Sequence, residues 1–234
     1  MLSEHDRTDI YIESLDRGNT PFLNALEEEA LRSDVPIIRR SMQRFLKLML
    51  KMNNPMNILE VGTAVGFSAI LMAQYSDENS HITTIEKYEK RIPVAEKNFL
   101  ESGFSDKITF LKGDAADILH DLAGKISPPG TEAGSRTLAS LNQFDMIFMD
   151  AAKAQYINFL PDVMTLLKPG GVLITDNVLQ DDTVIQSKYT VVRRDRTIHK
   201  RMREYLYELM NNEELTTDIL KVGDGIAVSV KRSI

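Results

Sequence analysis

The chain has 234 residues, 43% of them hydrophobic and 26% charged, with a formal net charge of −6 and a sequence pI near 5.3. This length fits one large domain or two small ones and is enough to bury a core without covalent staples. The absence of cysteine excludes disulfides, cysteine-ligated metal sites and cysteine nucleophiles. The acidic balance argues against general coating of nucleic acid, although a local basic patch is compatible with it.

No uncharged apolar stretch approaches the roughly 18–20 residues that span a bilayer. The first residues, MLSEHDRTDIY, are charged where a secretory signal peptide needs an apolar segment. We therefore expect a cytoplasmic protein with no membrane partner.

Residues 1–53 are expected to form an N-terminal helical segment. Within 38–50 the apolar residues recur at helical spacing, which predicts an amphipathic helix. The pattern changes after Pro55. The remainder, residues 54–234, is expected to complete a single domain with this segment.

From residue 57 onward, short β-branched or aromatic runs alternate with helical patterns, which predicts right-handed βαβ units on a parallel sheet. The expected strands are 58–61, 82–86, 108–111, 144–150 and 172–176. The expected helices between them are 66–74, 93–101, 115–122 and 156–167, the last ended by the Lys-Pro-Gly-Gly that starts at Lys168.

The C-terminal part departs from this alternation. A helix is expected at 195–211, and strands 218–222 and 226–231 flank a Gly-Asp-Gly hairpin signal, so the sheet should end in an antiparallel pair. Residues 127–142, SPPGTEAGSRTLASLN, are rich in proline, glycine and small polar residues and predict a flexible surface loop. The fold class is therefore α/β, mostly parallel, with helices on both faces.

Three successive strand ends carry groups that suit an adenosyl ligand. The loop EVGTAVG (60–66) follows the first strand and opens a helix, where small residues allow close backbone approach and N–H groups are free. Glu86 ends the second strand and can accept both ribose hydroxyls, and Asp114 follows the third and can face the adenine edge. The alternative is a set of ordinary strand-to-helix turns.

The next two strand ends carry hard oxygen ligands. Asp150 follows the fourth strand, and Asp176 and Asn177 follow the fifth, which suits Mg²⁺ or another divalent ion with open positions for substrate. Lys153 would point at the same place. An ammonium beside a metal and a methylsulfonium loses its proton more readily, so Lys153 is a candidate general base. The alternative is a pair of helix-capping aspartates beside a solvated lysine.

The segments LEVGTAVGFSA, IEK, GDA, MDAAKAQY and ITDN resemble those of the cation-dependent O-methyltransferases, the family of catechol and caffeoyl-CoA O-methyltransferases, from Val35 to the C-terminus. The resemblance implies a class I S-adenosylmethionine methyltransferase (Rossmann-like) fold, a homodimer, and Lys153 with Asp150 at the catalytic centre. It implies metal ligation by Asp150, Asp176 and Asn177. The implied cofactor contacts are Ile37 or Ile38, Glu60, Gly62, Ser68, Glu86, Asp114, Ala115 and Asp150.

Two departures from the family bear on the acceptor. The chain has no tryptophan, and Asp150 is followed by two alanines, where members that act on catechols or phenylpropanoids usually carry bulky or aromatic residues. An aromatic-poor mouth disfavours a small phenolic substrate.

The tail is similar to a bacterial branch that methylates 5-hydroxyuridine at the tRNA wobble position. Between residues 188 and 203 only Asp195 is acidic, and the basic residues are Lys188, Arg193, Arg194, Arg196, Lys200, Arg201 and Arg203. Such clusters neutralise phosphates, and we assign RNA contacts to Arg193, Arg194, Arg196, Lys200 and Arg203. The alternative is a solvated helix face.

The expected partner is therefore a tRNA anticodon loop. In 5-hydroxyuracil the hydroxyl lies beside the 4-oxo group, and this oxygen pair can chelate a metal as a catechol does. The rival hypotheses are methylation of a small catechol-like or phenylpropanoid-type metabolite, and a fold that binds the adenosyl group without chemistry.

Overall fold

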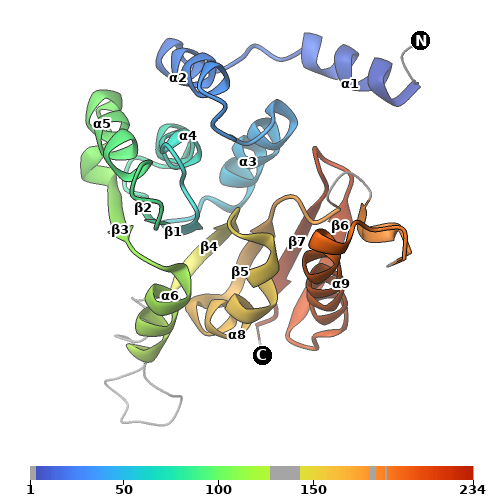
Figure 1. Cartoon of the computed structure of the whole chain (residues 1–234). Coiled ribbons are helices and arrows are strands. Elements are labelled where there is room, and N and C mark those ends of the chain that lie inside the picture. The colour runs from blue at the N-terminus through green and yellow to red at the C-terminus, as the bar shows by residue number, and fades with distance from the viewer. Residues whose placement is uncertain (1–3, 127–142, 180–182, 188, 234) are drawn as a thin grey trace.

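The computed structural model describes residues 4–126, 143–179, 183–187 and 189–233. The expected flexible loop at 127–142 and the basic residue Lys188 lie outside these residues. The described chain forms one seven-stranded sheet in the order β3-β2-β1-β4-β5-β7-β6, with helices on both faces (Figure 1). None of the described helices is both long and apolar enough to cross a membrane.

Five strands run parallel and two complete the sheet in antiparallel pairing, so the expected fold class is confirmed. The strands are β1 (Asn57–Val61), β2 (His81–Glu86), β3 (Ile108–Lys112), β4 (Phe144–Met149), β5 (Leu167–Thr175), β6 (Leu215–Leu220) and β7 (Ile226–Lys231). The chain builds outward from β1 to β3 and then returns to place β4 on the other side of β1. Open α/β sheets bind ligands at the carboxyl ends of the strands beside such a switch point.

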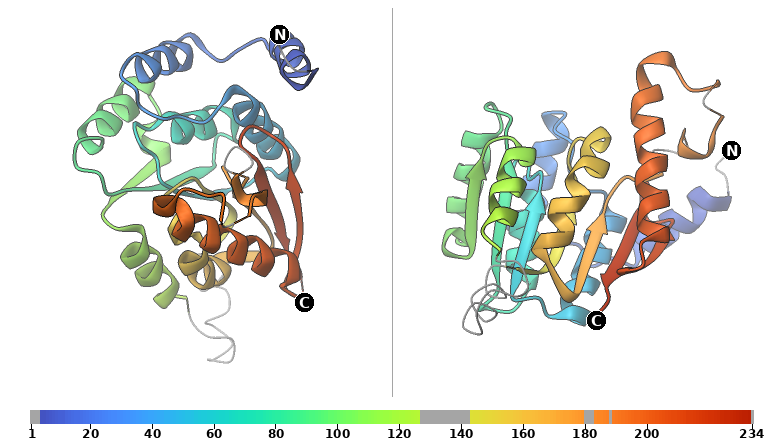
Figure 2. Two further views of the ribbon diagram at one scale, coloured as in Figure 1. Left: turned by 45° about the vertical axis from the view of Figure 1, so that its right-hand side comes forward. Right: turned by 90° about the horizontal axis from the view of Figure 1, so that it is seen from below.

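The helices form two layers that bury separate apolar clusters against the sheet (Figure 2). One layer contains α2 (Pro21–Arg32), α3 (Arg40–Asn53), α4 (Phe67–Tyr75) and α5 (Ile92–Ser102). The other contains α6 (Ala115–Gly124), α8 (Tyr156–Leu166) and α9 (Arg196–Asn211). Short 3₁₀ turns are η1 (Ser105–Lys107), η2 (Lys153–Gln155), η3 (Thr183–Ile185) and η4 (Arg193–Asp195).

The N-terminal segment is helical, as the spacing predicts. The amphipathic helix α3 buries Met42, Leu46 and Leu50 in the cluster that covers one face of the sheet. By contrast α1 (Glu4–Ser14) lies away from the sheet, and Ile10 and Tyr11 on it are exposed (Figure 1).

The helix α8 ends at Leu166, one residue before the expected end, but the next strand begins at Leu167 and not at 172, so the Lys-Pro-Gly-Gly segment belongs to β5. Leu167 pairs with Phe144, and the register shifts before Met146, which is the signature of a bulge. Gly171 is required at this bulge, since an added Cβ would lie 2.9 Å from the Lys168 carbonyl oxygen. Glycine and proline therefore mark a strand irregularity here.

Candidate active site

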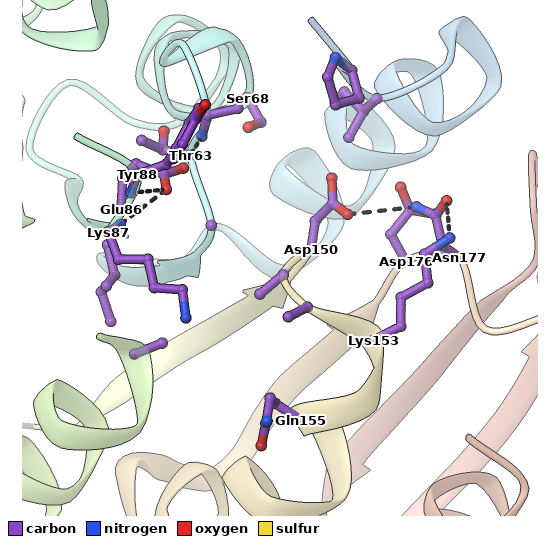
Figure 3. A pocket seen from close by; sticks show the side chains of 18 of the residues that line it. Thr63, Ser68, Glu86, Lys87, Tyr88, Asp150, Lys153, Gln155, Asp176 and Asn177 are labelled. Carbon is purple, nitrogen blue, oxygen red and sulfur yellow. Dashed lines mark hydrogen bonds between the residues drawn. The ribbon is translucent and has the colours of Figure 1, made fainter. Parts of the chain in front are cut away.

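The carboxyl ends of the parallel strands open on a cleft of about 930 Å³ (Figure 3). This cleft brings together nearly all of the residues expected to bind cofactor or metal. Those that line it are Ile37, Ile38, Gly62, Ser68, Glu86, Asp114, Ala115, Asp150, Lys153, Asp176 and Asn177. Glu60 is the exception, because its side chain is fully buried at the end of β1 and does not line the cleft.

The loop after β1 needs glycine for two reasons. Gly62 has a φ of 96°, a conformation that side chains other than glycine rarely adopt, and Gly66 has a φ of 89°. In addition, a Cβ on Gly62 would lie 2.3 Å from the carbonyl oxygen of Asp150. The ends of β1 and β4 therefore meet at a backbone contact that excludes any side chain.

Two oxygen atoms behind this loop have no hydrogen-bond partner among the described residues, namely Glu60 Oε1 and Thr63 Oγ1. The other carboxylate oxygen of Glu60 accepts a short hydrogen bond from the Thr84 hydroxyl. Burial raises the pKa of Glu60 to about 7, although neighbouring hydroxyl groups offset part of this effect. Thr63 lines the cleft, so a ligand that brings an ammonium or hydroxyl group to the loop can reach its hydroxyl, whereas Glu60 stays buried behind the loop. The Thr63 hydroxyl and the uncovered loop backbone fit the amino-acid end of an adenosylmethionine.

Glu86 at the end of β2 is already engaged by the backbone. Its carboxylate accepts N–H groups from Ala64 at 2.9 Å, Lys87 at 2.9 Å and Tyr88 at 2.8 Å (Figure 3). The residue thus fixes the glycine loop to the second strand. Carboxylate oxygens accept more than one hydrogen bond, so the expected contact with ribose hydroxyls stays a prediction.

Asp114 caps a helix at the same edge. One of its oxygens accepts the Ala116 N–H at 2.9 Å as the N-cap of α6, and the other pairs with the Lys87 ammonium at 3.0 Å. The Ala116 N–H, followed by Lys87, holds the pKa of Asp114 below its usual range. Asp114 is therefore a helix-capping aspartate, as the alternative interpretation expected. Its contact with an adenine edge stays a prediction.

The expected metal ligands lie beside Lys153. The side-chain amide of Asn177 connects Asp150 with Lys153 (Figure 3). Its nitrogen lies 3.5 Å from Asp150 Oδ1, and its oxygen accepts a hydrogen bond from Lys153 Nζ at 3.1 Å. The Asn177 N–H donates to Asp176 Oδ1 at 2.7 Å. Asn177 has a φ of 61°, a left-handed conformation that asparagine tolerates better than most residues. This local geometry turns its amide toward the two strand ends.

The charges at this edge are unbalanced. Burial raises the pKa of Asp150 and that of Asp176, and repulsion from Asp150 raises that of Asp176 further, while Lys153 lowers both. Two crowded carboxylates and an amide oxygen suit a divalent cation of the Mg²⁺ type. The described residues contain no cluster of three or more His, Cys, Asp or Glu side chains able to hold a metal, so the amide is an essential part of the candidate set.

The sequence did not indicate the role of Tyr156. Its side chain is fully buried, and its hydroxyl accepts the Ala151 N–H at 3.2 Å and donates to the Asp176 carbonyl at 3.4 Å. It therefore fastens the two loops that carry the carboxylates. Its position at the start of a helix beside Asp150 was the only sequence signal.

The sequence also did not indicate an ion pair between Arg39 and Asp224. Arg39 precedes α3 and Asp224 lies in the hairpin between β6 and β7, and their side chains are 2.7 Å apart. Both residues line the cleft. The hairpin signal predicted the turn, but nothing local indicated that it would reach the N-terminal segment.

The basic residues lie outside the 930 Å³ cleft, on η4 and α9. Arg196 donates to the Val191 carbonyl at 3.2 Å, and Arg203 donates to the Val184 carbonyl at 3.1 Å. All five candidate RNA contacts, Arg193, Arg194, Arg196, Lys200 and Arg203, are exposed. Arg194 has Asp195 within 3.6 Å, and Lys200 has Glu204 within 3.6 Å. The structure thus distinguishes Arg196 and Arg203, which hold backbone carbonyls, from Arg193, Arg194 and Lys200.

Comparison with known proteins places these features in a family. A family model of O-methyltransferases matches residues 13–232. A catechol O-methyltransferase of Niastella koreensis is 33% identical over 147 residues, which cover 63% of this chain and 60% of that protein. The chain therefore spans less than two thirds of the length of that relative.

Solved structures agree with this result. A Staphylococcus aureus protein provisionally assigned as a caffeoyl-CoA O-methyltransferase superposes with a TM-score of 0.82 at 32% identity, covering 97% of this chain and all of that one. An O-methyltransferase from Bacillus cereus, solved with SAH, gives a TM-score of 0.79 at 22% identity over 97% of each chain and shows the shared fold alone. The expected enzyme class is confirmed: the chain belongs to the O-methyltransferase family.

Proposed function

We propose that the protein transfers a methyl group from S-adenosylmethionine to a hydroxyl that forms part of a vicinal oxygen pair, with the aid of a divalent cation such as Mg²⁺. One observation carries this proposal: Asp150, Asp176, Asn177 and Lys153 are joined by side-chain contacts at the edge of the cleft that the expected cofactor residues line.

Residues that line the cleft support the proposal that S-adenosylmethionine is the cofactor. The Thr63 hydroxyl lines the cleft without a hydrogen-bond partner among the described residues, and Gly62 leaves the loop backbone uncovered. Glu86 and Asp114 follow at the next two strand ends along the cleft. The Bacillus cereus relative, solved with SAH, has the same fold.

The methyl transfer depends on the residues that follow β4 and β5. Asp150, Asp176 and Asn177 would hold the cation, and a cation there would lower the pKa of the acceptor hydroxyl. Lys153 takes the hydroxyl proton at Nζ, and Asn177 orients that nitrogen through its amide oxygen. The acceptor oxygen forms a bond to the methyl carbon as the carbon–sulfur bond breaks, so the protein's main task is alignment.

For the acceptor we propose 5-hydroxyuridine at the wobble position of a tRNA. Support comes from the resemblance of the tail, from the exposed cations Arg193, Arg194 and Lys200, and from the chelating oxygen pair of the base. An anticodon-loop base is unpaired, so its extrusion into a cleft costs little. A small catechol-like acceptor is the second candidate, which the names of the Niastella koreensis and Staphylococcus aureus relatives favour.

One experiment separates the two acceptors. The protein is incubated with methyl-labelled S-adenosylmethionine, Mg²⁺ and total tRNA from a strain lacking the enzyme, and the tRNA is digested to nucleosides. Label in 5-methoxyuridine supports the tRNA acceptor. Unlabelled tRNA, together with labelled product from a simple catechol, would replace it with the small-molecule acceptor. Light scattering on the same preparation tests the proposed homodimer.

A further inference from the structure

Large apolar side chains are exposed on the segment between η3 and η4. Ile185 is 70% exposed, Tyr189 is 76% exposed and Val192 is 61% exposed. Arg193 and Arg194 follow directly and are exposed as well. We call these five residues the η3–η4 surface. The segment that carries it folds beside the start of α9 (Figure 2).

The exposure of these residues is specified by their neighbours. Val184 is 5% exposed and Val191 is 6% exposed, so each outward-facing residue at 185 and 192 follows one that is buried. The segment is anchored at both ends in the apolar interior. An outward-facing apolar residue beside a buried one is therefore a surface feature and not a poorly formed core.

Side chains of α9 hold the backbone of this segment in place. Arg203 donates to the Val184 carbonyl at 3.1 Å, and Arg196 donates to the Val191 carbonyl at 3.2 Å. Between them, a ring nitrogen of the buried His199 lies 3.1 Å from the Gln186 carbonyl oxygen. Residues 196, 199 and 203 share one helical face, so a single face of α9 supports the surface. Because α9 holds the backbone of this segment, the ordering cost of binding to it is low.

The η3–η4 surface is continuous with the catalytic edge. A second cavity of about 310 Å³ is lined by Lys153 together with Val191, Val192, Asp195 and His199. A molecule bound at Lys153 and extending through this cavity would meet Val192, which directly precedes Arg193 and Arg194.

We propose that the η3–η4 surface binds the single-stranded RNA that flanks the methylated base, with a neighbouring base stacked on Tyr189 and phosphates held by Arg193 and Arg194. An aromatic ring beside cations is the usual means of holding unpaired nucleotides, because every base offers a face for stacking. The local positive charge, in a chain of net charge −6, complements a polyanion. This inference rests on the proposed RNA acceptor.

The test uses the full-length protein and an anticodon stem-loop RNA that contains 5-hydroxyuridine. Tyr189→Ala should raise KM for this RNA roughly 5- to 100-fold, the range expected for one lost base–aromatic stack. Tyr189→Phe keeps the ring and should retain the wild-type KM. Turnover of the free 5-hydroxyuridine nucleoside or of a simple catechol should be the same in all three proteins, which also verifies folding and the catalytic centre.

Tyr207→Ala is the matched control, because Tyr207 is 70% exposed on α9 but lies about 16 Å along the helix from its first residue. It should leave KM for the RNA unchanged. If Tyr189→Ala also leaves that KM unchanged while the wild-type protein methylates the RNA, the η3–η4 surface does not bind RNA. If the wild-type protein methylates no RNA, the proposed acceptor fails first. A rise in KM confined to a caffeoyl-CoA substrate would assign the surface to a CoA ester instead.

Discussion

Glu60 has no exposed surface, and its burial raises its pKa from an ordinary value near 4.5 to about 7. A carboxyl group with a raised pKa binds its proton more tightly in the folded state than in the unfolded state. The free energy of unfolding therefore falls as pH rises between these two values and levels off above about 7. Deprotonation of Glu60 therefore lowers the free energy of unfolding of the protein without bound ligand.

We predict that Glu60→Gln removes this part of the pH dependence. Between pH 5 and pH 8 the wild type should lose up to about 3 kcal/mol more stability than the variant, from the shift at this one group. Asp150 and Asp176 contribute slopes of the same sign in both proteins, so the difference isolates Glu60. Urea unfolding at the two pH values measures it, and parallel pH profiles would contradict the raised pKa.

Glu86→Ala is expected to weaken S-adenosylmethionine binding by about 1–3 kcal/mol, because buried polar partners are left unsatisfied. The structure adds a cause, since the variant also loses the anchor for the N–H groups of Ala64, Lys87 and Tyr88. Calorimetric titration measures the dissociation constant. The exposed neighbour Glu89→Ala is the control and should bind normally. An unchanged constant in Glu86→Ala would remove this residue from the cofactor site.

Asp176→Ala should abolish most turnover while leaving affinity for S-adenosylmethionine nearly intact. The reason is that Asp176 is assigned to the cation, whereas the residues assigned to the adenosyl group by their position lie mainly at the ends of β1, β2 and β3. EDTA should also abolish most turnover of the wild-type protein. Added Mg²⁺ should restore the activity of the wild-type protein but not that of Asp176→Ala. Full turnover in chelator would overturn the metal assignment.

At the scale of the elements, four arginines of α9 and of the segment before it differ in their hydrogen bonds, although they belong to one basic run in the sequence. All four are exposed, but Arg196 and Arg203 hold backbone carbonyls and Arg193 and Arg194 lie on η4. Replacing all of them would mix loss of phosphate contacts with loosening of the segment. Replacing only the two arginines of η4 gives the cleaner experiment.

Arg193→Ala combined with Arg194→Ala should raise KM for tRNA and reduce the salt dependence of RNA binding. Each lost phosphate contact lowers the slope of log K against log salt by roughly 0.7–0.9. The dissociation constant for S-adenosylmethionine and the turnover of a small catechol should not change. If tRNA methylation keeps its KM and its salt slope in the double variant, these cations belong to an ordinary solvated surface.

At the scale of the whole molecule, the sheet order makes the site, because the reversal between β1 and β4 leaves their carboxyl ends side by side. The end of β1, which we assign to the cofactor, and the end of β4, which we assign to the metal, meet at a backbone contact between Gly62 and the carbonyl of Asp150. A change at this contact should therefore affect both strand ends.

Gly62→Ala should destabilise the fold and impair both cofactor and metal binding. Gly103→Ala is the matched control, because Gly103 also has a positive φ but has nothing within 4 Å of an added Cβ. The control reports the conformational strain alone, about 1–2 kcal/mol. Gly62→Ala should exceed that cost in urea unfolding and should lower affinity for S-adenosylmethionine. Equal effects in the two variants would mean that the contact relaxes without consequence.

Much of this architecture was predictable from sequence, because hydrophobic periodicity and strand ends are local properties. The alternation of short apolar runs with helical spacing specified the α/β class, the parallel strands and the antiparallel end. Once the strands were placed, residues such as Glu86, Asp150 and Asp176 had to lie at one edge of the sheet, since parallel strands share their carboxyl side. The candidate cleft follows from that constraint.

Other features depended on partners distant in the chain. The Lys168 segment has the composition of a turn, yet pairing with β4 makes it a strand with a bulge. Arg193 and Arg196 are both arginines in one basic run, and only the path of the segment decided which one meets a carbonyl. The Arg39–Asp224 pair likewise needed two loops from opposite ends of the chain to converge. Sequence determined which residues reach the edge of the sheet, because that is set by local periodicity. Tertiary structure decided what each side chain bonds there, because hydrogen bonds and charges act over a few ångströms in space, whatever the separation along the chain.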